Sequence, residues 1–382
     1  MKAYSVIRLM NESYGSVRFY MPVNLIFGDN VVSRFGRYHT LGNNCLIVTG
    51  RNLYKKCSVL DDIYTGLENC GVSYTLFNET ENNPSLDTVY KIVKTYHFNK
   101  CDFIIGAGGG SSMDAAKAAA LLSANPDIEG DDIFDPNKFR NPPLPLILIG
   151  TTAGTGSEVT KASVLTFKSG RNITKKTVKS ADSYAKYALC DFKYTYTMTD
   201  ETTYSTALDT VSHAAEAYFS KKCGEIERLF AVKALKTVKK ALNNFRNNEK
   251  SENIRRELYI ASLYAGMAIN GSGTSLAHSM GYQLTSYKGV PHGAACAVFL
   301  TEFLSRMSES DEFLKASGFN GLVDFDDFIS GLLELCQVRY KLSDYEIADF
   351  SSLAVKMPNI NNHTSKPVGY DECRVIYSKC CG

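Results

Sequence analysis

Residues 101–117 read CDFIIGAGGGSSMDAAK, which is a short apolar run, three consecutive glycines and the start of an alanine-rich stretch. A short apolar run is typical of a buried strand, and Met113–Ser123 has the composition of a helix. The glycines at 108–110 would let the backbone turn tightly and approach a ligand closely. Uncapped N–H groups at the helix start, near Ser111 and Ser112, attract an anion such as a pyrophosphate. The segment therefore predicts a strand, a phosphate-binding turn and a helix.

Two observations keep this turn open to another interpretation. A glycine-rich connection between a strand and a helix can also be a tight turn that binds nothing. The spacing departs from the GxGxxG pattern of dinucleotide-binding folds, because Ser111 stands where the third glycine would be. An ordinary Rossmann fingerprint is therefore not predicted.

The N-terminal half alternates short apolar runs with longer amphipathic stretches. Expected strands are Cys45–Val48, Ser73–Phe77, Phe103–Ile105 and Leu146–Ile149, and expected helices are Leu86–Tyr96 and Met113–Ser123. Alternation at this spacing predicts βαβ units and a parallel sheet, hence an α/β domain.

The C-terminal half carries apolar residues at helical spacing and lacks clear strand runs. Expected helices are Thr202–Phe219, Glu225–Asn244, Ile254–Asn270 and Asp326–Val338. The boundary is expected within Asp191–Thr199, after the run Tyr187–Cys190. The prediction is an α/β domain over residues 1–193 and an all-α domain over residues 194–382.

The amino-acid composition limits the classes of protein to which this chain can belong. The chain has 382 residues, 42 Lys and Arg against 40 Asp and Glu, and 44% hydrophobic residues, which indicates globular domains rather than disorder. The near-neutral charge argues against nucleic-acid binding, and the lysine cluster Lys175–Lys179 is interpreted as a solvated loop. The apolar runs are far shorter than the roughly 18 residues of a membrane span. No secretory signal is recognised near the N-terminus, and eleven cysteines without a CxxC pair favour reduced thiols in the cytoplasm.

A second polar loop follows the expected strand Leu146–Ile149. Residues 150–160 read GTTAGTGSEVT, which combines hydroxyl groups with a flexible backbone. Such a loop at the end of a parallel strand would meet a ligand in the crevice of an open α/β sheet. It could equally be a polar loop with a capped helix, and the two interpretations are compatible.

Four residues of the helical half form a candidate metal site. Asp209 and His213 are four residues apart in an expected helix, so their side chains share one face. His278 and His292 follow, the latter in a Pro-His-Gly turn. One carboxylate and three imidazoles suit Fe²⁺ or Zn²⁺ and leave coordination positions for a substrate oxygen. Taken singly, each histidine is better explained by a structural role.

With these motifs in place, the sequence resembles the iron-containing (group III) alcohol dehydrogenase family over essentially its whole length. The matching motifs are Phe19-Tyr-Met-Pro, Phe27-Gly28, residues 108–114, residues 151–158, residues 209–218, His278 and Pro291-His292-Gly293. The resemblance implies an N-terminal dinucleotide-binding domain, a helical C-terminal domain, and a cofactor and metal in the cleft between them. It also implies a homodimer.

The resemblance assigns roles residue by residue. It implies that Asp209, His213, His278 and His292 are the metal ligands. It places the nucleotide against Gly108, Gly109, Gly110, Ser111, Ser112, Asp114, Asn83, Thr151, Thr152, Thr160, Lys175 and Thr195. Lys175 is assigned through its spacing to Val178, with Lys176 and Lys179 as nearby alternatives.

Two departures from the family pattern bear on specificity. Gly50, followed by Arg51, stands where many members with an NAD preference carry an aspartate. A carboxylate there would bind the ribose 2′-hydroxyl, whereas Arg51 could pair with a 2′-phosphate, so NADP(H) is expected unless Arg51 is merely solvated. Tyr282 replaces a histidine that lies near the substrate in many relatives. A phenol donates a hydrogen bond at neutral pH but is a poor proton shuttle.

The expected activity is the interconversion of a small alcohol and its aldehyde or ketone by hydride transfer between substrate and NAD(P)H, with the metal polarising the carbonyl. Two alternatives differ in class. One is a dehydroquinate-synthase-like lyase, which would need several basic residues around a phosphorylated substrate. The other is a metal- and nucleotide-binding relative without turnover.

Overall fold

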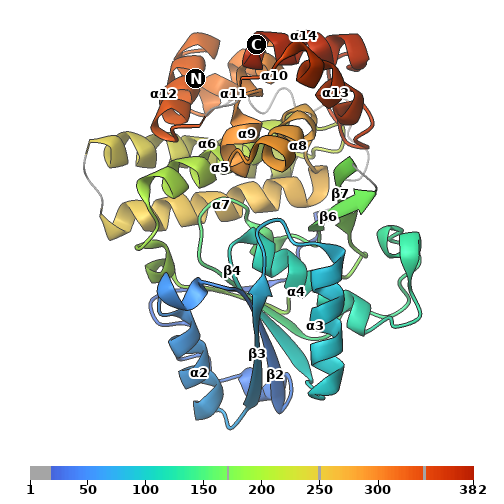
Figure 1. The fold of residues 1–382 in the computed structure, drawn as a ribbon. Helices are drawn as coiled ribbons and strands as arrows, with labels where there is room; N and C mark the ends of the chain where they lie inside the picture. Colours follow the sequence, from blue (N-terminus) through green and yellow to red (C-terminus); the bar gives the residue numbers. More distant parts are fainter. Residues whose placement is uncertain (1–18, 170–171, 248–250, 339–340) are drawn as a thin grey trace.

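The computed structural model describes residues 19–169, 172–247, 251–338 and 341–382. The chain forms a sheet-containing part and a helical part, which lie one above the other in Figure 1. The helical part faces the ends of the sheet strands, because the loop after one strand packs directly on the helices: the backbone of Gly154 lies against Thr206. The predicted α/β part and the predicted helical part are thus both present, in that order along the chain.

The sheet has six parallel strands in the order β1-β8-β5-β4-β2-β3. Their bounds are β1 (Asn24–Phe27), β2 (Asn44–Gly50), β3 (Ser73–Thr80), β4 (Phe103–Gly108), β5 (Leu146–Gly150) and β8 (Tyr187–Cys190). The four predicted strands lie within β2, β3, β4 and β5, so the parallel sheet is confirmed. β1 was not predicted, and the residues of β8 were recognised only as a run before the domain boundary.

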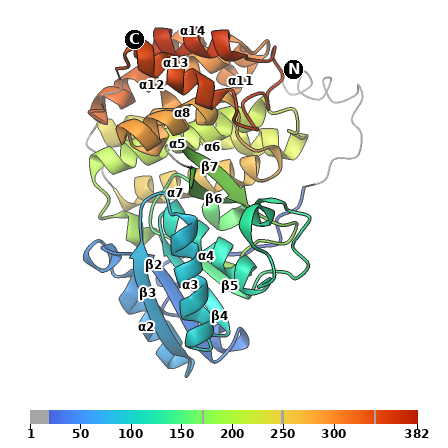
Figure 2. The same cartoon turned by 45° about the vertical axis from the view of Figure 1, so that its right-hand side comes forward.

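Neighbouring residues of the central strands enter two different cores. Ile47 and Ile105 belong to the core on one face of the sheet, whereas Leu46 and Ile104 belong to the core on the other. This division follows from the alternation of side chains along a strand, and it explains the unbroken apolar runs of β2, β4 and β5. Helix α2 (Val59–Asn69) covers the first face, and α3 (Leu86–Phe98) and α4 (Gly110–Ser123) cover the second (Figure 2).

The direction of strand addition reverses between β2 and β4. These strands are neighbours, yet the chain leaves β2 through α2 toward β3 on one side and leaves β4 through α4 toward β5 on the other. The carboxyl ends of strands that flank such a reversal are where open α/β sheets bind ligands. Gly50 ends β2 and Gly108 ends β4, so both lie at this point.

Among the described residues, every element from Asp200 onward is a helix, as predicted. These helices are α5 (Asp200–Tyr218), α6 (Glu225–Arg246), α7 (Glu252–Ser272), α8 (Leu276–Lys288), α9 (His292–Ala297), α10 (Leu300–Ser305), α11 (Ser310–Ala316), α12 (Leu322–Leu335), α13 (Asp344–Ala354) and α14 (Tyr370–Cys381). The expected helix Asp326–Val338 ends earlier, at Leu335, because Gln337 takes a left-handed conformation with φ 51°. Among the described residues, no helix combines the length and the apolar composition that a membrane span needs.

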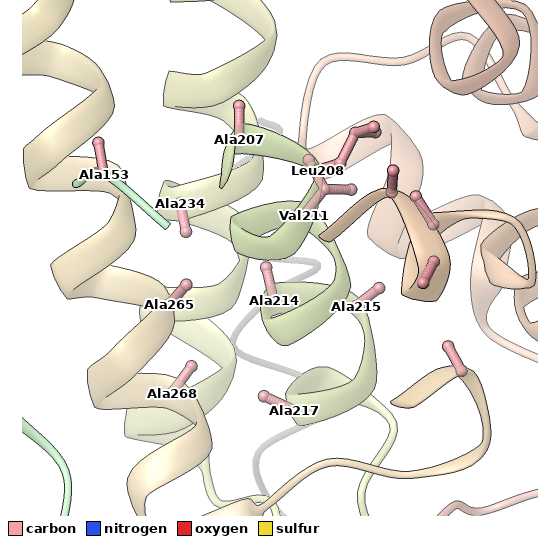
Figure 3. Packing of buried hydrophobic residues seen from close by; sticks show 14 of the residues in the cluster. Ala153, Ala207, Leu208, Val211, Ala214, Ala215, Ala217, Ala234, Ala265 and Ala268 are labelled. Atoms are coloured by element: carbon pink, nitrogen blue, oxygen red, sulfur yellow. The ribbon is translucent and has the colours of Figure 1, made fainter. Parts of the chain in front are cut away.

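Helix α5 is the centre of the helical part and contacts α6, α7 and α9. Its buried residues are mostly small, and Figure 3 shows Ala207, Ala214 and Ala217 beside Ala234 and Ala265 of the neighbouring helices. Alanine side chains let helix axes come close together, so polar side chains carried by α5 are held in a densely packed surrounding.

One sequence interpretation was wrong. The lysine cluster expected as a solvated loop lies mainly in β7 (Asn172–Val178), which pairs antiparallel with β6 (Ser163–Ser169). Lys175 is buried rather than solvated. The β-branched residues Ile173, Thr174 and Thr177 favour this strand, but the lysines between them obscured the signal.

Candidate active site

The four predicted metal ligands come together at one point. Asp209 and His213 lie one turn apart on α5, His278 lies on α8, and His292 is the first residue of α9. The Nε2 atoms of His213, His278 and His292 lie 3.7, 3.6 and 3.9 Å from Oδ1 of Asp209. The rings of His213 and His278 stack with centroids 4.7 Å apart. One carboxylate oxygen is thus faced by three imidazoles from three helices.

This cluster fits a divalent cation. Oδ1 of Asp209 and Nε2 of His278 are buried, and neither has a hydrogen-bond partner among the described residues. Buried polar atoms without partners are costly, so they indicate a ligand that satisfies them. Two ligand atoms of one tetrahedral ion lie about 3.3–3.6 Å apart, which is close to the separations around Oδ1.

The charges of these groups suit metal binding. Burial opposes ionisation of Asp209, but His213 and the other imidazoles outweigh it and hold the pKa of Asp209 below its ordinary value. Burial lowers the pKa of both His213 and His292. At neutral pH the site therefore offers one carboxylate and the neutral imidazoles of His213 and His292, which are the forms that bind a metal. Burial opposes the charge of His278, but Cys296 and Glu216 outweigh it and hold the pKa of His278 above its ordinary value, so a metal that binds there displaces a proton.

Glu216 orients His278 and was missed by the sequence analysis. Its fully buried carboxylate contacts Nδ1 of His278 and accepts a hydrogen bond of 3.1 Å from the backbone N–H of the same residue. Carboxylates that bind the second nitrogen of a metal-binding histidine fix its tautomer and ring orientation. The spacing in the sequence could have identified Glu216. It follows His213 by three residues and Asp209 by seven, so all three share one face of α5.

Two glycines allow the helices of the site to approach. A Cβ atom at Gly293 would lie 1.9 Å from the backbone oxygen of Ser205, so only glycine lets α9 pack against α5 and bring His292 to Asp209. A Cβ at Gly281 on α8 would lie 2.9 Å from the Cα of Cys296 on α9.

Tyr282 lines the same site. Its ring stacks on His292 with centroids 5.3 Å apart and planes 7° apart, and it meets the ring of His278 edge-on at 6.1 Å. Burial raises the pKa of Tyr282 above its ordinary value, so the phenol is neutral and can donate a hydrogen bond.

Cys296 is a second residue that the sequence analysis missed. Its Sγ lies 3.8 and 3.9 Å from the two ring nitrogens of His292. Potential ligand atoms of Asp209, His278, His292 and Cys296 all lie within 4.8 Å of one another. The signal in the sequence was again spacing, because Cys296 follows His292 by four residues. The other histidines lie apart: His39 and His97 are exposed, and His363 is buried elsewhere.

The glycine turn lies at the carboxyl end of β4, as predicted. Gly108 has φ 142°, which favours glycine, and Gly109 precedes α4 without a side-chain cap. A Cβ at Gly110 would lie 2.7 Å from Thr155, and one at Gly109 would lie 3.4 Å from Thr152. The turn is therefore packed closely against the second polar loop, which also donates a backbone hydrogen bond of 2.9 Å from Thr151 to the carbonyl of Gly108.

Asn83, Ser111 and Lys175 form one hydrogen-bonded group near this turn. The backbone N–H of Asn83 donates to Oγ of Ser111 at 3.1 Å, and Nζ of Lys175 donates to Oδ1 of Asn83 at 2.9 Å. Burial lowers the pKa of Lys175 to about 8. Three predicted nucleotide contacts, distant in sequence, are thus adjacent in space.

Three other predicted nucleotide contacts are engaged within the protein. The carboxylate of Asp114 accepts hydrogen bonds from Oγ of Ser157 at 2.6 Å and from the backbone N–H of Val164 at 2.8 Å. The hydroxyl of Thr195 is fully buried and donates to the carbonyl of Phe192 at 2.7 Å. The hydroxyl of Thr160 is bound by Nζ of Lys117 at 3.3 Å.

Lys117 is the residue that joins these loops, and the sequence analysis assigned it no role. Its fully buried Nζ donates to Oγ of Ser157 at 2.7 Å and to the carbonyl of Ala162 at 2.6 Å, and it lies 3.1 Å from Asp114. Arg51, which follows the end of β2, is exposed, and a Cβ at Gly50 would lie 3.8 Å from Oγ of Ser112.

Comparisons with known proteins show which protein family this chain is similar to. A model of the family described as iron-containing alcohol dehydrogenase matches residues 22–192, and a model of the C-terminal part of the same family matches residues 203–323. Alcohol dehydrogenase 4 of Schizosaccharomyces pombe is 32% identical over 74% of this chain and 66% of its own length. The 1,3-propanediol dehydrogenase of Citrobacter freundii is 30% identical over 75% of this chain and 74% of its own.

Solved structures agree with the sequence comparisons. The crystal structure of an iron-containing alcohol dehydrogenase from Thermotoga maritima superposes with a TM-score of 0.86, is 34% identical, and covers 96% of this chain and all of its own. The named relatives are alcohol dehydrogenases and aldehyde reductases, which favours the oxidoreductase over the lyase and the inactive relative. The geometry of the cluster, the two family matches and these superpositions lead to one conclusion: the chain belongs to the iron-containing alcohol dehydrogenase family.

Proposed function

We propose that Asp209, His213, His278 and His292 bind one Fe²⁺ or Zn²⁺ ion and that this site interconverts a small alcohol and its aldehyde or ketone with NADP(H). One observation carries the proposal: three imidazoles converge on a buried carboxylate oxygen that has no other partner among the described residues. Membership of the family implies the iron ion, the NAD(P) nucleotide and the alcohol or aldehyde substrate.

The second polar loop connects the metal cluster to the glycine turn. Thr152 and Thr155 pack on Gly109 and Gly110, and the carbonyl of Gly154 accepts a hydrogen bond of 3.3 Å from Thr210, the residue after Asp209. A nucleotide whose diphosphate binds at the turn would therefore extend toward the cluster. The N–H groups at the start of α4, which no side chain caps, would bind the diphosphate, and the Asn83–Lys175 pair would add hydrogen bonds and positive charge.

When bound, the ion would polarise the substrate carbonyl while the nicotinamide supplies or accepts the hydride. Side chains of the protein support this step through their positions around the site. Glu216 holds the His278 ring so that Nε2 faces Asp209. The neutral phenol of Tyr282 can donate a hydrogen bond into the site, but its raised pKa makes it a poor proton shuttle.

The activity can be tested directly with the purified protein. We expect oxidation of NADPH with a panel of short aldehydes, loss of that rate after removal of metal by a chelator, and recovery when Fe²⁺ or Zn²⁺ is added. Short substrates are supported by relatives named 1,3-propanediol dehydrogenase and NADPH-dependent butanol dehydrogenase. A rate that chelation leaves unchanged would contradict the metal site.

The preference for NADP(H) is proposed from Gly50 and Arg51. Exchanging Gly50 for aspartate is expected to lower the ratio of kcat/KM for NADPH to that for NADH by about tenfold, because a carboxylate repels a 2′-phosphate and binds a ribose hydroxyl. The side chain should fit, since the nearest atom to a Cβ at Gly50 is the carbonyl of Thr80 at 3.4 Å. Steady-state kinetics with both nucleotides measure the ratio.

The neutral variant Gly50→Asn is the matched control, because it adds the same volume without the charge. The ratio should change clearly less in this variant than in Gly50→Asp. Equal ratios in the two variants would refute the electrostatic argument for NADP(H).

Compartment and assembly are further parts of the proposal. A cytoplasmic location is supported by the eleven cysteines, all of which are free thiols, as expected in a reducing compartment. A homodimer is supported by the resemblance to the family, and light scattering of the purified protein would test it.

A further inference from the structure

Cys296 places a sulfur atom at the edge of the cluster of proposed metal ligands, Asp209, His213, His278 and His292. It lies one turn after His292 on α9, so both side chains project from the same face of that helix. The glycine at 281 brings the backbone of Cys296 against α8, the helix that carries His278. The residue is buried, so its thiol faces the cluster rather than solvent.

The distances around Cys296 are slightly longer than those between neighbouring ligands of one ion. Sγ lies 3.9 Å from Nε2 of His292, and its distances to ligand atoms of Asp209 and His278 are no more than 4.8 Å. An ion with a bond of about 2.3 Å to sulfur and about 2.0 Å to nitrogen separates the two atoms by roughly 3.0–3.7 Å at bond angles between about 90° and 120°. The atoms that lack partners, Oδ1 of Asp209 and Nε2 of His278, belong to the same group and are buried.

We propose that Cys296 is a further metal ligand of this enzyme, binding as a thiolate beside Asp209 and the histidines and giving the ion a mixed oxygen, nitrogen and sulfur environment. The inference rests on the metal site of the proposed function. On binding, the S–H bond breaks, a sulfur–metal bond forms and the proton passes to solvent, with no change in oxidation state.

A thiolate ligand changes which ions the site prefers. Thiolates bind Zn²⁺ and Co²⁺ well, whereas Mn²⁺ prefers oxygen ligands. The affinity of the enzyme for Zn²⁺ should therefore depend on Cys296 more strongly than its affinity for Mn²⁺ does.

The test uses the full-length enzyme after removal of metal, titrated with CoCl₂ under nitrogen. Wild-type protein should bind one Co²⁺ per chain and show a near-ultraviolet charge-transfer band from sulfur to cobalt. Cys296→Ser and Cys296→Ala should lose this band while keeping the visible absorption of bound Co²⁺. Chelator competition should show a Zn²⁺ affinity lower by about tenfold or more in both variants, with a smaller change for Mn²⁺.

The matched control is Cys373→Ser, which replaces a fully buried cysteine on α14 outside the cluster and should keep the band. Wild-type protein that binds one Co²⁺ without the band, or a Cys296→Ser variant that retains it, would overturn the proposal.

Failure of the underlying metal site would look different. If His278→Ala bound Co²⁺ as well as wild type does, the proposed site itself would be wrong. If His278→Ala lost the ion while wild-type protein bound it without a sulfur band, only the role of Cys296 would be wrong.

Discussion

Replacing Asp209 by alanine is expected to reduce the metal content of the purified protein to near zero and to lower kcat/KM for aldehyde reduction by at least about a thousandfold. This loss corresponds to about 4 kcal/mol of transition-state stabilisation, the scale expected when a metal that polarises a carbonyl is removed. Asp209 is the only carboxylate among the four predicted ligands, and all three imidazoles face its Oδ1. Elemental analysis and NADPH oxidation measure the two effects.

The fold should survive this substitution. Oδ1 of Asp209 has no hydrogen-bond partner among the described residues, so removing it breaks no bond to that atom. The imidazoles hold the pKa of Asp209 below its ordinary value, so its ionised form stabilises the fold and the variant loses that contribution. Thermal unfolding of the metal-free variant should therefore remain cooperative and shift to a somewhat lower temperature than that of the metal-free wild type. His97→Ala, which changes an exposed histidine, should leave both metal content and rate unchanged. Full activity in Asp209→Ala would refute the assignment of the site.

Replacing Glu216 by alanine is expected to weaken metal binding by about 10–100-fold, although Glu216 is not one of the predicted metal ligands. The reason is the contact of its carboxylate with Nδ1 and the backbone N–H of His278, which fixes the ring that points Nε2 at Asp209. Loss of such an orienting carboxylate typically costs this much in metal affinity. Chelator competition with Zn²⁺ provides the measurement.

The variant Glu216→Gln separates orientation from charge. Its amide oxygen can still accept one of the two hydrogen bonds, so its affinity for Zn²⁺ should lie between those of wild type and Glu216→Ala. Glu201→Ala, an exposed glutamate in the first turn of the same helix, is the control and should bind Zn²⁺ like wild type. Unchanged affinity in Glu216→Ala would show that His278 is oriented by packing alone.

Patterns within short segments were interpreted correctly. The apolar runs of β2, β4 and β5 predicted a parallel sheet because strands buried on both faces need apolar side chains at every position. The four-residue spacing of Asp209 and His213 predicted a shared helix face. Three consecutive glycines, from the last residue of β4 to the first residue of α4, predicted a turn before a helix, and a Cβ at Gly110 would indeed clash with Thr155.

The hydrogen bonds that Glu216 and Lys117 form with distant segments were not predicted. Glu216 meets His278 across 62 residues, and Lys117 meets Ser157 across 40. Neither glutamate nor lysine is expected to be buried, so composition suggested exposed side chains for both. The hairpin of β6 and β7 was missed for a related reason, since its lysines resemble a solvated loop until Lys175 is seen bonded to Asn83.

The amino-acid sequence by itself determined the two-part fold and the glycine turn, because these depend on periodicity and on motifs of a few residues, and the resemblance to a known family identified the proposed metal ligands. Only the tertiary structure decided that Glu216 orients His278 and that Cys296 lies beside His292 among the potential ligand atoms. The physical reason is that burial and partnership of a polar group are set by how helices pack, and this packing depends on close approaches such as Gly293 against Ser205, which no local pattern reveals.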